Sequence, residues 1–178
     1  MTLRHAAPVF ALITFALPAS LADKGLTTKI TISTTDQAVP IEVNGPTLGM
    51  FHIWRGPGVI VNHVPQTEGF IIDWSKGLVE HRPSGLQRYR VSFYTGCPAG
   101  LCEEKEVGPK LSYVVLYEYD AAAKKGYVYL PGKGDPEYQI NTRSILRGLE
   151  GGWFVAISEW QEYVTPIILK IQRAIREP

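Results

Sequence analysis

The two cysteines of this 178-residue chain lie close together, in the segment TGCPAGLC (residues 95–102). Enzymes that exchange thiols and disulfides use Cys-x-x-Cys at the start of a helix, which lowers the pKa of the attacking thiol. Here four residues separate Cys97 from Cys102, and Pro98 and Gly100 favour a turn. In an oxidising compartment two thiols this close should be joined. We therefore predict a structural disulfide, with free thiols and a redox or metal-binding role as the alternatives.

Three histidines, His52, His63 and His81, are candidate metal ligands. The segment FHIWRGPGVIVNHV (51–64) is predicted to form a hairpin that turns at Gly56–Pro57, which places His52 and His63 diagonally on one face. With His81 from a following loop, they would offer the nitrogen ligands that zinc and copper favour. However, a shift of one residue in the strand pairing separates them, and the face they share is otherwise apolar. We therefore predict no bound metal or other cofactor, with the histidine site as an alternative.

The segment YEYDAAAKKGYVY (117–129) contains four tyrosines around one predicted turn. We expect Asp120 and Gly126 to face each other at the two ends of that turn, so that all four rings lie on one face of a hairpin. The four are Tyr117, Tyr119, Tyr127 and Tyr129. Such a row of rings with hydroxyl rims suits sugar rings and protein partners, and predicts a binding surface. The alternative is that a helix or loop covers the rings and that they only stabilise the sheet.

The acidic residues form no recognisable catalytic pattern. Asp73 and Asp135 lie in segments typical of turns, whereas Glu118 falls on the apolar face of its predicted strand and needs a partner or a raised pKa. The sequence contains no Gly-x-Ser-x-Gly or His-Glu-x-x-His motif, and the GKG at 132–134 lacks the spacing of a phosphate-binding loop. We predict no catalytic residue, with an active site of dispersed carboxylates as the alternative.

The first 22 residues have the layout of a secretory signal peptide. Arg4 precedes an apolar run over residues 6–17, and small side chains at positions 20 and 22 fit cleavage after Ala22. The run is shorter than the roughly 20 apolar residues that a membrane anchor needs. We therefore expect residues 1–22 to be removed and residues 23–178 to be exported, to the periplasm or beyond, as a single domain without a membrane span.

Short apolar and β-branched runs, bounded by Gly, Pro, Asn and Asp, predict strands through most of the chain. These runs are residues 27–34, 41–43, 48–54, 59–64, 69–74, 88–95, 111–119, 127–130 and 153–158. The gaps between them are too short for crossover helices, so the strands should pair antiparallel. The fold class is therefore α+β and predominantly β, with the antiparallel sheet arranged as a sandwich, an open barrel or one strongly curved layer.

The C-terminal segment has the periodicity of a helix instead. Ser158–Gln161 fits a capping box, and Thr165–Pro166 is typical of a helix start. Four isoleucines then follow at helical spacing on one face: Ile167, Ile168, Ile171 and Ile175. We expect this amphipathic helix to pack on the sheet, and a second helical turn to form over residues 142–149.

The net charge of the predicted exported chain limits the kind of partner that it can bind. Residues 1–22 contain one of the 18 Lys and Arg residues and none of the 17 Asp and Glu residues, so the exported chain would have 17 of each sign. A formal charge near zero gives no electrostatic footprint for nucleic acid. We therefore expect a small exported binding protein without catalytic activity, an accessory protein or inhibitor that contacts an envelope protein or glycan. The alternatives are an enzyme acting on an envelope polymer and a metal-binding protein.

Overall fold

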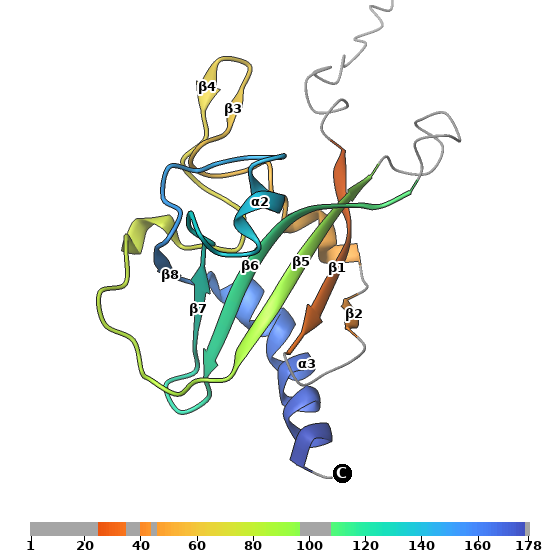
Figure 1. Cartoon of the computed structure of the whole chain (residues 1–178), viewed down its shortest axis with the longest axis vertical. Coiled ribbons are helices and arrows are strands. Elements are labelled where there is room, and N and C mark those ends of the chain that lie inside the picture. The colour runs from red at the N-terminus through yellow and green to blue at the C-terminus, as the bar shows by residue number, and fades with distance from the viewer. Residues whose placement is uncertain (1–24, 35–39, 44–45, 97–107, 177–178) are drawn as a thin grey trace, which may run out of the picture.

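A computed structural model of the chain describes residues 25–34, 40–43, 46–96 and 108–176 (Figure 1). The predicted signal peptide (residues 1–22) and both cysteines, Cys97 and Cys102, lie outside the described residues. Export and the disulfide therefore stay predictions. Within the described ranges, no helix combines the length and the apolar character that crossing a bilayer requires.

An antiparallel sheet of six strands, in the order β2-β1-β5-β6-β7-β8, forms the centre of the fold. The strands are β1 (Leu26–Ser33), β2 (Ile41–Val43), β5 (Arg88–Gly96), β6 (Lys110–Asp120), β7 (Lys125–Tyr129) and β8 (Trp153–Val155). A small hairpin of β3 (Ile60–Val61) and β4 (Val64–Pro65) projects from one end (Figure 1). The helical elements are the 3-10 turns η1 (Pro46–Met50) and η2 (Trp74–Lys76), and the helices α2 (Tyr138–Asn141) and α3 (Ser158–Arg176). The predicted class, a predominantly β fold with a C-terminal helix, is confirmed.

Alternation along β5 separates a buried face of the sheet from a more polar one. Tyr89, Val91 and Phe93 have no exposed surface and lie on the side that α3 covers, which we call the helix face. Arg88 and Arg90 lie on the opposite side, the outer face, together with the residues that pair with them on β6. In Figure 1, α3 crosses behind the sheet. The period of two in this stretch is that of a strand with one face in the core.

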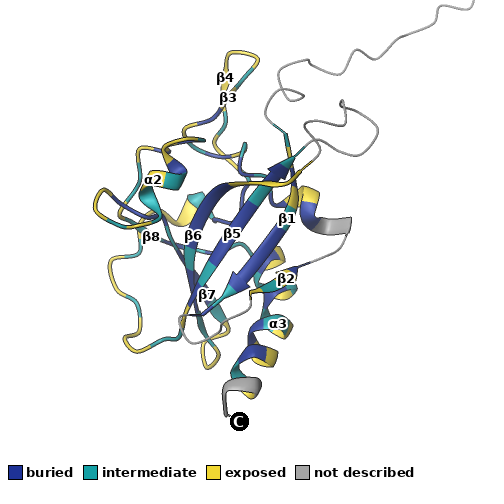
Figure 2. Cartoon of the chain, turned by 45° about the vertical axis from the view of Figure 1, so that its right-hand side comes forward, coloured by how far each residue is buried: buried dark blue, intermediate teal, exposed yellow. Residues whose placement is uncertain are grey.

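Helix α3 packs on the helix face through one stripe of apolar residues. Trp160, Val164, Ile168 and Ile171 have no exposed surface, and their spacings of four, four and three residues keep them on one side of a helix. The Trp160 ring contacts the rings of Phe51, Phe93 and Tyr117 at centroid distances of 5.0 to 6.1 Å. Figure 2 shows the helix buried along one side and exposed along the other. The predicted packing of this helix on the sheet is confirmed.

The start of α3 differs from the prediction, because the helix begins at Ser158 and continues through Pro166. Thr165–Pro166 is not the start, since Trp160 and Val164 extend the buried stripe toward the N-terminus. Nor does Gln161 close a capping box. Its side chain accepts a hydrogen bond from the Gly126 N–H and donates one to the Ala156 carbonyl, both at 2.8 Å, which fixes the first turn to the sheet.

Three segments that were expected as strands fold differently. Residues 48–54 form the end of η1 and a turn, and residues 69–74 contribute one bridge, Ile72 to Ala156, before η2 begins. Residues 59–64 contain the turn of the β3–β4 hairpin instead of one strand. Phe51 and Ile53 are nevertheless buried. Their segment packs into the core as a loop, so an apolar run here indicates burial without indicating strand pairing.

The second helical turn lies earlier than predicted, at α2 instead of residues 142–149. Asn141, at the end of α2, is fully buried. Its side-chain amide accepts a hydrogen bond from the Val114 N–H and donates one to the Val114 carbonyl, both at 2.8 Å. Strand β7 pairs with β6 only from Leu116 to Asp120. Asn141 therefore takes the place of a neighbouring strand where β7 has ended.

Candidate functional site

The pairing of β6 with β7 differs by one residue from the predicted hairpin. Tyr119 lies opposite Gly126, and Asp120 lies opposite Lys125. The Asp120 carboxylate accepts hydrogen bonds from the N–H groups of Ala122 and Ala123, which stabilises a tighter turn over residues 121–124. A shift of one residue turns every side chain of one strand to the other face. The four tyrosines therefore do not share one face, and that part of the prediction is wrong.

Tyr117 and Tyr119 lie on the helix face, and Tyr117 belongs to the core. Its ring has no exposed surface and meets the Trp160 ring edge to face at 6.1 Å. A Cβ added at Gly126 would lie 2.2 Å from the Tyr117 hydroxyl oxygen, so only glycine fits beside this ring. Among the described residues the hydroxyl has no hydrogen-bond partner, and burial raises the pKa of Tyr117 well above its usual range. Tyr117 therefore supports the fold and offers nothing to a partner.

We expect opposite results from removing the hydroxyls of Tyr117 and Tyr129. Tyr117→Phe should leave the free energy of unfolding unchanged or raise it, because a buried hydroxyl without a partner gains nothing from folding. Tyr129→Phe should lower it by about 1 kcal/mol, because the Tyr129 hydroxyl donates a hydrogen bond to Asp135 at 2.8 Å. Urea unfolding of the two variants checks this. A larger loss in Tyr117→Phe than in Tyr129→Phe would contradict the core assignment.

Tyr127 and Tyr129 lie on the outer face, beside a cluster of ionic and aromatic side chains. Glu118 is only 2% exposed, and its two carboxylate oxygens pair with Arg82 and Arg88. The Arg82 guanidinium also stacks 4.0 Å from the centre of the Trp153 ring. The carboxylate therefore has the partners that its burial requires. Arg82 ties the segment between η2 and β5 to the sheet, and this cluster is best explained as structural.

The three histidines do not come together. His52 lies in the loop after η1, where its Nδ1 accepts a hydrogen bond from the Thr27 N–H at 3.4 Å, and burial lowers the pKa of its ring. His63 lies in the β3–β4 turn and His81 on the exposed segment before β5. The predicted hairpin register that joined His52 and His63 is wrong, because residues 48–54 are not a strand. In the part of the chain that the structure describes, no group of three His, Cys, Asp or Glu side chains could hold a metal ion.

A cleft that the sequence did not predict lies where three distant segments meet. Its volume is about 620 Å³, and we call it the Trp74 cleft. It is bounded by the loop after η1, by the segment that leads into η2, and by the first turn of α3. Its lining residues are Met50, Phe51, Arg55, Thr67, Glu68, Gly69, Phe70, Ile72, Asp73, Trp74, Ser75, Ile157 and Glu159. Phe51, Phe70 and Ile72 are buried and form the floor. The exposed residues of the rim are mostly polar, and Met50 is an exposed apolar residue among them. A volume in this range is typical of ligand and peptide sites.

Unusual backbone conformations shape one wall of this cleft. Phe70 has φ +68°, which is rare for a bulky residue, and follows Gly69 at φ +92°. The Phe70 ring is fully buried against Phe93 and Tyr113, and this packing offsets the backbone strain. The Trp74 indole N–H donates to the Gly69 carbonyl at 2.7 Å. Strained residues held by their surroundings often mark functional sites.

A buried arginine joins the two walls of the cleft. Arg147 is 5% exposed, and its guanidinium donates to three backbone carbonyls of the opposite loop at 2.7 to 3.1 Å. These carbonyls belong to Ile53, Arg55 and Pro57. The same group lies 4.5 Å from the Phe70 ring centre and 5.5 Å from that of Trp74. Burial lowers the pKa of Arg147, and the nearby Tyr113 opposes this shift. Arg147 is therefore a positioning residue beneath the cleft.

The rim of the cleft contains both signs of charge. Arg55 and Glu68 are exposed, and neither side chain forms a hydrogen bond or ion pair with another described residue. Asp73 caps η2, as its predicted turn role requires, because its Oδ1 accepts from the N–H and hydroxyl of Ser75. Glu159, in the first turn of α3, accepts from the Ser158 hydroxyl at 3.1 Å. Arg55 and Glu68 are therefore the two charged rim side chains that are open to a partner.

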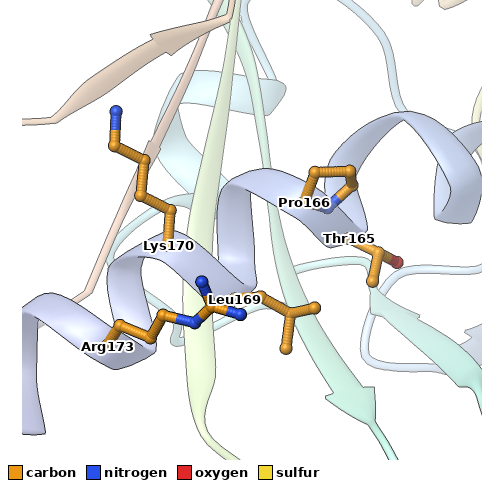
Figure 3. A pocket seen from close by; sticks show the side chains of 5 residues that line it. All are labelled: Thr165, Pro166, Leu169, Lys170 and Arg173. Atoms are coloured by element: carbon orange, nitrogen blue, oxygen red, sulfur yellow. The ribbon is translucent and has the colours of Figure 1, made fainter.

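A second depression, of about 340 Å³, lies on the side of α3 away from the sheet (Figure 3). It is lined by Thr165, Pro166, Leu169, Lys170 and Arg173, all from this one helix. The Thr165 hydroxyl turns back to the Gln161 carbonyl at 2.5 Å, beside the proline. Since no other element of the described structure contributes to it, this is a shallow helix surface. The Trp74 cleft is the stronger candidate.

No family model, curated protein or solved structure matches this chain. The candidate site therefore depends on its geometry alone. Sequence reasoning missed Arg55, Glu68 and Arg147. One signal was present: Arg147 is the single charge within the apolar run ILRGL (145–149), which indicates a buried cation.

Proposed function

We propose that this chain is a small exported binding protein that acts by contact through the Trp74 cleft. The observation that carries the proposal is an open cleft of about 620 Å³ with two of its bordering segments joined by Arg147, while its rim side chains Arg55 and Glu68 have no described partner. Joining the bordering segments before a partner binds reduces the entropy lost on binding. An apolar floor inside a polar rim is the usual anatomy of a contact surface. The partner would be an envelope protein or glycan.

The binding surface proposed here replaces the tyrosine face. Tyr117 is in the core, and Tyr127 is buried on the outer face. Tyr129 is half-buried, and its hydroxyl is bound to Asp135. These rings therefore offer little contact area. The cleft lies beyond the C-terminal end of β8, where Ile157 and Glu159 line it together with the segment that leads into η2.

A second candidate function is an enzyme that hydrolyses an envelope polymer. The observation that favours it is the presence of three carboxylates, Glu68, Asp73 and Glu159, along the same cleft. Pairs of carboxylates perform acid and base chemistry on glycosidic bonds. Release of reducing ends from purified envelope glycan, lost in Glu68→Gln or Glu159→Gln, would favour the enzyme over the binding protein.

A capture experiment tests the binding proposal. The purified protein is immobilised and exposed to envelope extract, beside Arg55→Glu and the control Arg143→Glu, which reverses an exposed charge outside the cleft. We expect Arg55→Glu to lose at least about 90% of the captured partner, because the donating guanidinium at the rim is replaced by a carboxylate that can only accept hydrogen bonds. Arg143→Glu should retain it. Both variants should keep the wild-type melting temperature. Equal capture by all three proteins would refute the proposal.

A further inference from the structure

The rim of the Trp74 cleft is acidic on balance. Three carboxylates, those of Glu68, Asp73 and Glu159, line it together with one guanidinium, that of Arg55, which gives 3 − 1 = 2 excess negative charges. The N-terminus of α3 contributes a positive end charge of about half a unit, which leaves the rim negative. Asp73 uses only Oδ1 for its turn within the described structure, so Oδ2 can still accept. Such a rim repels phosphate and other anions, and attracts cations.

The apolar part of the cleft offers an aliphatic contact, two buried rings and one ring that is partly covered. Phe51 and Phe70 are buried, at 1% and 0% exposure. The Trp74 ring is packed on Phe154, at a centroid distance of 5.4 Å, and against the backbone of Gly56, where an added Cβ would lie 2.6 Å from the indole nitrogen. Sugar binding by stacking needs a free aromatic face. Here the exposed apolar group is Met50, at 50% exposure.

Met50 suits the side chains of a peptide. A methionine side chain is flexible and polarisable, so it adapts to aliphatic groups of different shape, as at many peptide-binding surfaces. Arg55 adds donors that fit a backbone carbonyl of an extended chain. Its own stem lies on Gly69, where an added Cβ would come within 2.8 Å of the Arg55 Cβ. Arg55 itself is exposed and lines the cleft, so its donors are accessible there.

We infer that the Trp74 cleft receives an extended basic peptide segment of a protein partner. An aliphatic side chain of that segment packs on Met50, and a Lys or Arg side chain lies among Glu68, Asp73 and Glu159. This inference rests on the proposed binding function and makes it specific: the partner is a protein with a basic, partly apolar segment, and not a glycan.

Three probes test the inference: an alternating Lys-Leu hexapeptide, its Glu-Leu counterpart, and a trimer of N-acetylglucosamine. Amide chemical-shift changes in isotope-labelled protein report both the site and the affinity. We expect the Lys-Leu peptide to shift the amides of Met50, Glu68–Ser75 and Glu159, and to bind at least about tenfold more tightly than either other probe. The affinity should fall as salt is added.

A matched pair of double variants separates the cleft from general attraction between charges. Glu68→Gln with Glu159→Gln removes two rim carboxylates, and Glu80→Gln with Glu162→Gln removes two exposed carboxylates outside the cleft. The first should weaken the Lys-Leu peptide about tenfold or more, and the second less than about twofold. The inference is overturned if both weaken it equally, if the shifts lie outside the cleft, or if the Glu-Leu peptide or the sugar binds as well.

The failure of this inference is distinct from the failure of the proposed function. If Arg55→Glu abolishes capture of an envelope partner while the Lys-Leu peptide does not bind, the cleft is a binding site for another chemical class. If Arg55→Glu leaves capture unchanged, the binding function itself is wrong, whatever the peptides do.

Discussion

Replacing Arg147 by Met should lower the free energy of unfolding by about 3–5 kcal/mol, one of the largest losses expected for a single substitution in this chain. Methionine fills much of the same space, so the loss does not come from a cavity. It comes from the carbonyls of Ile53, Arg55 and Pro57, which lose their donors while their loop stays packed. Buried acceptors without donors each cost about 1–3 kcal/mol. Urea unfolding measures the change.

Two further variants make this test specific. Arg147→Lys should recover only part of the loss, because one ammonium group cannot reach three carbonyls as the planar guanidinium does. Arg143→Met removes an exposed arginine four residues earlier and should change the free energy by less than about 0.5 kcal/mol. If Arg147→Met and Arg143→Met unfold at the same urea concentration, the role of Arg147 beneath the cleft is wrong.

Ending the chain after Val164 should give a protein that unfolds or aggregates. The truncation removes Ile168 and Ile171, which have no exposed surface, and uncovers the part of the helix face that they contact. Burying each of these side chains contributes about 1.5–3 kcal/mol, and a domain of this size has only about 5–15 kcal/mol of net stability. The truncation also removes Gln172, whose amide donates to the Tyr89 hydroxyl at 2.9 Å. Circular dichroism and size-exclusion chromatography report the outcome.

A pair of neighbouring alanine variants is the control for the truncation. Ile168→Ala should cost about 2–5 kcal/mol, whereas Leu169→Ala, at a position that is 37% exposed on the other side of α3, should cost much less. A truncated chain that is monomeric with a cooperative melt would show that the second half of α3 is a detachable element.

The sequence was sufficient for the elements whose pattern is simple. The strands near residues 27–34, 88–95 and 111–119 have alternating side-chain patterns. Each of them pairs in the sheet with the strand that follows it in sequence. The helical spacing of Ile168 and Ile171 likewise identified the buried stripe of α3. It did not locate the helix start, because Trp160 and Val164 belong to the same stripe but precede a proline.

Three physical causes explain what the sequence could not show. Loop segments such as residues 48–54 contain buried apolar side chains without strand pairing, so periodicity alone assigns them wrongly. The pairing register of β6 and β7 is linked to the turn in which Asp120 accepts hydrogen bonds from two N–H groups. Because this register differs by one residue from the predicted one, two of the four tyrosines lie on the opposite face from the other two. The Trp74 cleft joins three segments that are distant in sequence, so no local pattern marks it, and Arg147 connects two of these segments through long-range contacts.

The side-chain amide of Asn141 also bears on how the protein behaves at high concentration. An uncovered strand edge presents unpaired N–H and carbonyl groups that can template the addition of a strand from another molecule. Strand β6 is eleven residues long and β7 only five, so part of β6 extends beyond its neighbour. By binding both backbone groups of Val114, Asn141 occupies the edge of β6 at that residue with a group that cannot extend into a further strand. The fold therefore contains a local protection against edge-to-edge aggregation just beyond the point where β7 stops pairing with β6.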